Sequence, residues 1–293
     1  MRQLRVVTSL VSLCVALAGG VEIAGAAEGI RKTETIQLRK YMGVLRTIDV
    51  TVGGETVPFI FDTAGGLTIV TPGLAHRHNC QEYGRIVGFR MSGEQLALPR
   101  CGEMQIGIGQ NQHEVETVVL DVMALLPEGW PEIGGIVSLH TFEDAAITIE
   151  LGADQITVET DESLVQRTAA MKALNSRFNS QTGGEGRDLF VEATARDGSL
   201  WLEVDSGNMG PVILAPHAFD QLGETHPGAD GGELELVLVG LEPMTVAVTE
   251  KPIIYDGVVS ARVLETLVLT VDTRTGQSWA VPVQKTDADA ETG

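Results

Sequence analysis

Short runs of apolar residues recur along the chain, and turn sequences such as Gly53-Gly54 and Asp197-Gly198 separate them. The runs are short and rich in β-branched residues, which favours strands over helices. The pattern therefore predicts a mainly β protein. Strands are predicted at residues 44–52, 56–61, 105–108, 115–120, 147–149, 189–194, 200–204, 234–239, 244–248 and 268–271.

The strand pattern occurs twice along the chain. Asp62-Thr63 follows the apolar strand 57–61, and Asp205-Ser206 follows the apolar strand 200–204. In both copies a proline then opens a short predicted helix, at a position where its missing N–H is not needed. Each copy closes with a third matched block and a strand, at 135–143 and 146–150 in the first copy and at 257–265 and 268–272 in the second. Three matched blocks in the same order predict two homologous lobes.

The two copies differ in length. Asp62 and Gly135 are 73 positions apart, whereas Asp205 and Gly257 are 52 positions apart. More than half of this difference falls before Gly109 in the first copy. The first lobe is therefore predicted to contain an extra hairpin.

The repeat divides the chain into a first lobe at residues 27–160 and a second lobe at residues 187–284. Residues 161–186 between them are predicted to form a linker. Within it, Ser163–Phe178 carries apolar residues at helical spacing, and the glycine-rich end indicates a flexible segment. The polar tail at 285–293 is predicted to be disordered.

The start of the chain has the layout of a cleavable secretory signal. Arg2 and Arg5 precede an apolar run at Val6–Leu17, and Ala24-Gly25-Ala26 follows. The sequence thus predicts a signal peptide at residues 1–26 and export to the periplasm or the extracellular space. Because a helix needs about 20 apolar residues to cross a bilayer, the shorter run predicts no stable membrane span.

Two cysteines remain beyond the predicted signal. In an oxidising compartment, an even pair such as Cys80 and Cys101 usually forms a disulfide. The alternative is a metal site, because His76 and His78 lie close to Cys80 in the sequence. No second group of ligands completes a four-coordinate site, so we expect no bound metal.

The chain is strongly acidic, with 40 acidic and 20 basic residues and a net charge of −20. This charge repels nucleic acids and anionic membrane surfaces, so neither is expected as a partner. It also keeps an exported protein soluble. It does not indicate a substrate.

Asp62 and Asp205 carry the chemistry that the repeat predicts. A carboxylate at the end of an apolar strand is costly to bury alone, and a pseudo-twofold axis makes each aspartate the partner of the other. Two adjacent carboxylates share one proton. The ionised group can then take a proton from water while the protonated group polarises a peptide carbonyl. Thr63 and Ser206 can hydrogen-bond across the axis, and the glycines after them allow a substrate backbone to approach.

These residues resemble a known family. Asp62-Thr63-Ala64-Gly65-Gly66 and Asp205-Ser206-Gly207 resemble the active-site loops of aspartic peptidases, whose pattern is Asp-Thr/Ser-Gly. Gly135-Ile136-Val137-Ser138 and Gly257-Val258-Val259-Ser260 resemble the second signature of that family, which supports the active loop. The similarity is closest to bacterial exported proteins with retropepsin-like domains. It implies two β-barrel lobes with a cleft between them, a peptide or protein substrate, and a single chain that acts as a pseudo-dimer.

The resemblance also implies a role for the extra hairpin. It would be a flap that closes over the substrate, with Val87, Gly88 and Phe89 near its tip. A disulfide between Cys80 and Cys101 would then hold the base of the flap. The alternative is an ordinary surface loop.

The sequence departs from the family pattern at three positions. Ala64 stands where the family has glycine in the active loop, and Ser138 and Ser260 each replace the glycine of the second signature. The main hypothesis is an aspartic endopeptidase that needs no cofactor. One alternative is an inactive protein of this fold that binds peptides or proteins in the cell envelope. Another is a β-sandwich binding module without a facing pair of aspartates.

Overall fold

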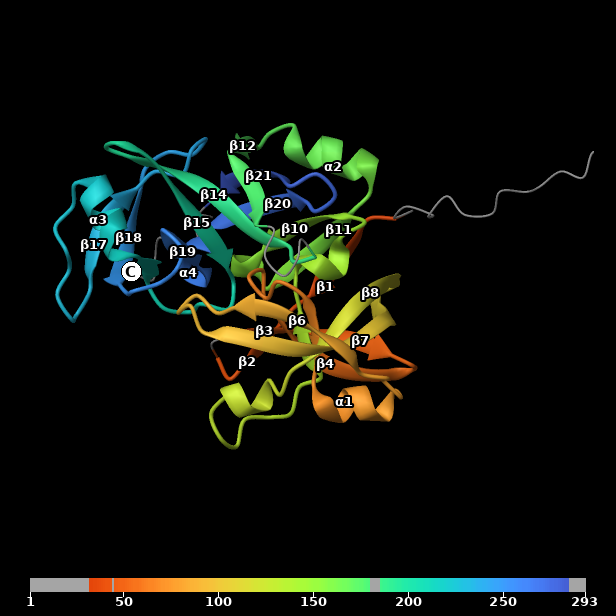
Figure 1. Cartoon of the computed structure of the whole chain (residues 1–293). Coiled ribbons are helices and arrows are strands. Elements are labelled where there is room, and N and C mark those ends of the chain that lie inside the picture. The colour runs from red at the N-terminus through yellow and green to blue at the C-terminus, as the bar shows by residue number, and fades with distance from the viewer. Residues whose placement is uncertain (1–31, 44, 180–184, 285–293) are drawn as a thin grey trace, which may run out of the picture.

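A computed structural model describes residues 32–43, 45–179 and 185–284 (Figure 1). The predicted signal peptide at 1–26 and the predicted tail at 285–293 lie outside the described residues, as does most of the glycine-rich linker end. All ten predicted strands overlap observed strands, because their apolar side chains form the core. The chain is mainly β and two-lobed, as predicted.

Within the described residues, twenty-one strands form three sheets. The first-lobe sheet contains β2 (Arg39–Tyr41), β3 (Leu45–Val52), β4 (Glu55–Phe61), β5 (Thr68–Val70), β6 (Tyr83–Phe89), β7 (Gln95–Ile108), β8 (Asn111–Val119) and β9 (Gly135–Val137). The second-lobe sheet contains β13 (Ser176–Asn179), β14 (Asp188–Ala195), β15 (Gly198–Asp205), β16 (Val212–Leu214), β17 (Gly232–Leu236), β18 (Met244–Glu250) and β19 (Gly257–Ser260). The central sheet contains β1 (Glu34–Gln37), β10 (Ala146–Glu150), β11 (Gln155–Glu159), β12 (Lys172–Leu174), β20 (Leu267–Asp272) and β21 (Gln277–Pro282).

The helices are short and lie at the ends of strands. They are α1 (Pro72–Arg77), α2 (Asp161–Thr168), α3 (Pro216–Leu222) and α4 (Ala261–Leu264), with the 3-10 turns η1 (Met123–Leu125), η2 (Leu139–Phe142) and η3 (Leu151–Ala153). Pro72 and Pro216 open α1 and α3, as the repeat predicts. Within the described residues, no helix is long and apolar enough to cross a membrane.

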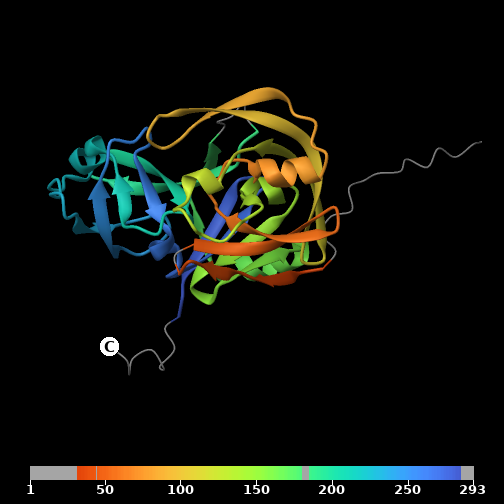
Figure 2. The ribbon, with the colours of Figure 1, turned by 90° about the horizontal axis from the view of Figure 1, so that it is seen from below.

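The strand order confirms the internal repeat. The first-lobe sheet has the order β2-β3-β4-β9-β5-β8-β7-β6, and the second-lobe sheet has the order β13-β14-β15-β19-β16-β18-β17. The two orders match strand for strand, and β6 has no counterpart. The extra hairpin of the first lobe is therefore β6 with the start of β7, and in Figure 2 it arches over the molecule toward the second lobe.

The central sheet joins the two lobes. In it, β10 of the first copy pairs antiparallel with β20 of the second, with Ala146 opposite Asp272 and Ile149 opposite Leu269. The sequence predicted both strands but not this pairing. Its effect is to hold the two lobes in one continuous hydrogen-bonded layer, which fixes the distance between the two aspartate loops.

The helix predicted at Ser163–Phe178 is wrong beyond its first half. Only α2 is helical, capped at its start by Thr160, and the chain then forms β12 and β13. Leu174 and Phe178 pack against the main core from these strands. The physical reason is pairing: β12 extends the central sheet beside β21, and β13 extends the second-lobe sheet beside β14. Here the hydrogen bonds of sheet pairing stabilise strands, although the apolar residues are spaced as in a helix.

Gly135 lies where only glycine fits. It pairs with Phe59 in β4 and Val70 in β5, and a Cβ at this position would lie 1.9 Å from the carbonyl oxygen of Ile69. The first-lobe sheet therefore closes tightly under the Asp62 loop. Gly257 is its counterpart in the second lobe, where a Cβ would lie 2.7 Å from the carbonyl oxygen of Ile213.

We expect Gly135→Ala to lower the free energy of unfolding by about 3 kcal/mol or more, because backbone must move to admit the methyl group. Urea unfolding followed by circular dichroism measures the change. Gly228→Ala is the matched control, since a Cβ at Gly228 has no heavy atom within 4 Å. Equal stability of the two variants would contradict the close approach at Gly135.

Candidate active site

The structure brings the two predicted aspartates to one cavity. Asp62 directly follows β4, and Asp205 is the last residue of β15. Both line a cavity of about 560 Å³ between the lobes, together with residues of the extra hairpin that include Gly88 and Phe89. This volume lies within the range of small-molecule and peptide sites.

Thr63 and Ser206 tie the two aspartate loops together across the axis. The N–H of Thr63 donates to Ser206 Oγ at 3.0 Å, and the N–H of Ser206 donates to Thr63 Oγ1 at 3.0 Å. Thr63 Oγ1 donates in turn to the carbonyl of Val204 at 2.6 Å, and Ser206 Oγ to that of Phe61 at 3.3 Å. The reciprocal contact matches the sequence prediction for these two residues. It leaves the loops little freedom to move relative to each other.

Backbone N–H groups hold each carboxylate in place. Ala64 N–H donates to Asp62 Oδ1 at 2.9 Å, and Gly207 N–H donates to Asp205 Oδ1 at 2.8 Å. Asn208 N–H adds a second bond to Asp205 Oδ1 at 3.0 Å. Because Ala64 uses its backbone, its methyl group does not remove this bond. A Cβ at Gly207, by contrast, would lie 2.8 Å from Asp62 Oδ2.

Burial of both aspartates, and the charge of Asp62 beside Asp205, favour a state in which the pair shares a proton. Burial raises the pKa of Asp62 above its usual value. Burial, reinforced by the negative charge of Asp62, raises the pKa of Asp205 to about 8. The two carboxyls titrate as a pair, since ionising one disfavours ionising the other. Below about pH 8 the pair therefore retains at least one proton.

The two serines of the second signature stand at the starts of short helices. Ser138 Oγ accepts a hydrogen bond from His140 N–H at 3.2 Å and so caps η2. Ser260 precedes α4 and pairs with Asp205 through the backbone of β19 and β15. Asp62 N–H donates to the carbonyl of Val137 at 2.9 Å. With serine at positions 138 and 260, both strands therefore still contact the backbone of the aspartate loops.

The extra hairpin covers the cavity. Of the three residues predicted near its tip, Gly88 and Phe89 line the cavity, whereas Val87 is 43% exposed and is not among the lining residues. Ile86 instead faces the core, because side chains alternate along a strand. At the tip, Ile254 N–H of the second lobe donates to the carbonyl of Met91 at 2.9 Å. The hairpin is therefore closed, and it reaches the second lobe.

The cysteine prediction is confirmed: Cys80 and Cys101 form a disulfide. Cys101 lies in β7 and Cys80 just before β6, so the bond joins the base of the extra hairpin. The alternative metal site does not form at these residues. Cys80 is oxidised, and His78 Nε2 lies 3.1 Å from Glu55 Oε2.

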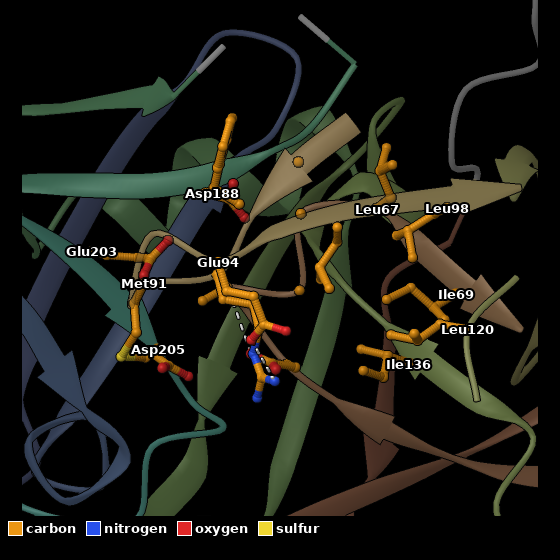
Figure 3. A pocket seen from close by; sticks show the side chains of 18 of the residues that line it. Leu67, Ile69, Met91, Glu94, Leu98, Leu120, Ile136, Asp188, Glu203 and Asp205 are labelled. Carbon is orange, nitrogen blue, oxygen red and sulfur yellow. Dashed lines mark hydrogen bonds and ion pairs between the residues drawn. The ribbon is translucent and has the colours of Figure 1, made fainter. Parts of the chain in front are cut away.

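Sequence reasoning missed two further carboxylates in the cavity, Asp188 and Glu203. Glu203 stands two residues before Asp205 on β15, so strand alternation alone places both on one face. Asp188 begins β14, the neighbouring strand. In Figure 3 the carboxylates of Asp188, Glu203 and Asp205 lie on one side of the cavity. The opposite side is apolar and is formed by Leu67, Ile69, Leu98, Leu120 and Ile136.

Comparisons with known proteins give structural neighbours only. No family model matches the chain, and no curated protein matches it in sequence. The aspartic proteinase from Irpex lacteus is 12% identical, with a TM-score of 0.52 over 88% of this chain and 99% of the proteinase. Basic 7S globulin from soybean is 9% identical, with a TM-score of 0.54 over 85% of this chain and 94% of the globulin. The chain has the two-lobed fold of the pepsin-like aspartic proteinases.

Proposed function

We propose that this protein is an aspartic endopeptidase that hydrolyses peptide bonds with a water molecule activated between Asp62 and Asp205. The observation that carries the proposal is the pairing of the two aspartate loops. Thr63 and Ser206 bond reciprocally across the axis, and both aspartates line one cavity. Catalytic aspartates need this preorganisation, whereas two aspartates in unrelated turns do not.

The steps follow from the shared proton. The ionised carboxyl of the pair takes a proton from the water as its oxygen attacks the peptide carbonyl, and the protonated carboxyl donates to the carbonyl oxygen. The resulting tetrahedral intermediate breaks down when a proton passes from the pair to the leaving nitrogen. The chain's own backbone N–H groups at Ala64 and Gly207 keep both carboxyls oriented throughout.

Cleavage of a mixed peptide library by the purified protein, from acidic to alkaline pH, tests the proposal. We expect cleavage that a statine-type inhibitor blocks, because its hydroxyl takes the place of the attacking water. The pH profile should be bell-shaped, with a basic limb as the pair loses its last proton; the pKa of Asp205, about 8, places that limb near pH 8. Absence of cleavage at every pH by the folded protein, or a profile without a basic limb, would contradict it.

A second candidate is a binding protein that holds peptides in the same cavity without cutting them. Two observations favour it. Ala64 replaces a glycine of the peptidase pattern and lines the cavity, and one structural neighbour is named as a globulin rather than a proteinase. The statine-type peptide separates the two candidates, since it binds in both cases but inhibits only an enzyme.

We further propose that the protein works outside the cytoplasm. The support is the disulfide between Cys80 and Cys101, which is typical of oxidising compartments. Labelling of free thiols in protein isolated from the native host checks this, and unreacted Cys80 and Cys101 are the expected result.

A further inference from the structure

Two carboxylates beside the aspartate pair have no role in the steps above. Asp188 is 6% exposed and Glu203 is 4% exposed, yet both line the cavity. Asp188 Oδ1 has no hydrogen-bond partner in the part of the chain that the structure describes. A buried carboxylate oxygen without a partner is unfavourable, so Asp188 Oδ1, beside the second buried carboxylate of Glu203, points to a missing cation.

Strand register explains how the two side chains reach the cavity. Glu203 is opposite Phe190 in the antiparallel pair β14–β15. Asp188 lies two residues before Phe190, and Asp205 lies two residues after Glu203. Residues two apart on a strand share a face, so Asp188, Glu203 and Asp205 all project from the same side of the second-lobe sheet. Figure 3 shows them together on that side of the cavity.

The first lobe shows what the fold itself requires at these positions. Ile60 stands two residues before Asp62 and is the counterpart of Glu203. Thr47 is opposite Ile60, so Leu45, two residues before Thr47, is the counterpart of Asp188. Ile60 is buried and Leu45 packs against the same apolar cluster. Apolar residues therefore satisfy the fold at both places, and the two carboxylates are not structural necessities.

The nearby cations have partners of their own. Arg90 at the flap tip pairs with Glu94 at 3.3 Å, and Arg187 lies 3.6 Å from Glu143. In the described part of the chain, no three acidic, histidine or cysteine side chains are grouped so that they could hold a metal ion. A long side chain with an ammonium or guanidinium end fits two spaced carboxylates better, because its donors spread over both.

We propose that Asp188 and Glu203 form a subsite for a lysine or arginine side chain of a peptide bound at the aspartate pair. The inference rests on the proposed function for the peptide itself. It adds a preference: one residue near the scissile bond is basic and enters the acidic side of the cavity, opposite the apolar wall.

Binding tests the subsite independently of cleavage. The probes are N-acetylated, statine-centred hexapeptides in which each flanking position in turn carries lysine or norleucine, its uncharged analogue. Isothermal titration calorimetry at pH 6 gives the Kd of each pair. At one position we expect lysine to bind about 10- to 100-fold more tightly than norleucine, the range for hydrogen bonds to a charged partner. Asp188→Asn and Glu203→Gln should each bring that ratio close to one.

The controls separate the subsite from general charge and from misfolding. Glu94→Gln removes a carboxylate from the same cavity and should keep the lysine preference within about twofold of wild type. Asp188→Leu with Glu203→Ile installs the first-lobe residues, so this double variant should fold and lose the preference. Lysine binding should also release a proton from Asp188, whose pKa burial and the charge of Asp62 raise to about 7. Calorimetry in two buffers of different ionisation enthalpy measures that release.

Failure of this inference is distinct from failure of the proposed function. If the inhibitor blocks cleavage but the lysine and norleucine peptides have equal Kd at every position, the subsite is wrong and the proposed peptidase activity is supported. Lysine-selective binding that needs Asp188, without cleavage, keeps the subsite and supports the binding protein. A third outcome is that lysine gives no gain over norleucine, but a norleucine peptide with a free N-terminus binds more tightly than its acetylated form. The cation is then a peptide N-terminus, and the side-chain subsite is wrong.

Discussion

Asp62→Asn and Asp205→Asn will each lower kcat/KM for peptide cleavage by about 10³-fold or more. An amide can neither take a proton from water nor give one to the peptide carbonyl, and general acid–base catalysis of this kind contributes about 10²- to 10⁴-fold. Each substitution also leaves the remaining carboxyl without the partner that shares its proton. The rates are measured on a peptide identified from the library, at the pH of maximal wild-type activity.

Loss of activity in these variants should not reflect loss of fold. Asparagine has nearly the same shape, and its Oδ1 can still accept from Ala64 N–H or Gly207 N–H. Asp230→Asn changes an exposed aspartate of the second lobe and should retain wild-type activity. If Asp62→Asn or Asp205→Asn keeps activity within tenfold of wild type while the inhibitor still binds, the chemistry lies elsewhere and the pairing of the two loops is only structural.

The parts of the site that the sequence predicted are those where one copy of the repeat supports the other. Asp62 and Asp205 each follow an apolar strand, and the structure places both in one cavity. Thr63 and Ser206 follow them and make the reciprocal contact. The extra hairpin also followed from the repeat, because its length had no counterpart in the second copy. A local sequence pattern is enough to predict such site residues when the same pattern occurs in both copies of the repeat.

Other features depend on contacts that no local pattern contains. The pairing of β10 with β20 joins residues far apart in sequence, and nothing in either strand specifies the other as its partner. The segment after α2 has apolar residues at a spacing that fits a helix, yet edge pairing makes it two strands. The extra hairpin was predicted from the length of the first copy, but which of its residues line the cavity depends on how it folds over the second lobe: Gly88 and Phe89 do, and Val87 does not.

Asp188 and Glu203 show a different limit. Alternation along β15 was enough to place Glu203 beside Asp205, so that signal was present in the sequence. Asp188 needed the register between β14 and β15, which only the structure supplies. The repeat gives no signal for either residue, because the matching positions of the first copy carry no carboxylate. The functional difference lies where the copies diverge, with Ile60 and Leu45 on one side and two carboxylates on the other.

These carboxylates should make the protein less stable as pH rises. Burial and the charge of Asp62 raise the pKa of Asp188 to about 7, against 3.8 in the unfolded chain. Between these values the folded state holds a proton that the unfolded state has lost, so the free energy of unfolding falls with increasing pH. The contribution is fully present below pH 3.8 and is lost as pH passes about 7. For Asp188 alone it amounts to about 4 kcal/mol.

Asp188→Asn removes this dependence, because an amide does not ionise. Near pH 4 the variant and the wild type should differ by less than about 1 kcal/mol, whereas at pH 8 the variant should be more stable by up to about 4 kcal/mol. Urea unfolding at pH 4, 6 and 8 measures the difference, with the exposed Asp230→Asn following the wild-type curve. A difference that stays constant with pH would mean that Asp188 is not buried as a carboxyl.

The same measurement links stability to the acidic subsite. A lysine-containing peptide that binds ionised Asp188 stabilises only the folded state, by an amount that grows with its concentration relative to Kd. At pH 8 it should therefore recover part of the stability that the wild type has lost. Asp188→Asn has no such loss to recover and should gain little. A protein that retains buried carboxylates at a cost in stability, where its other lobe has apolar residues, retains them for a ligand that neutralises them.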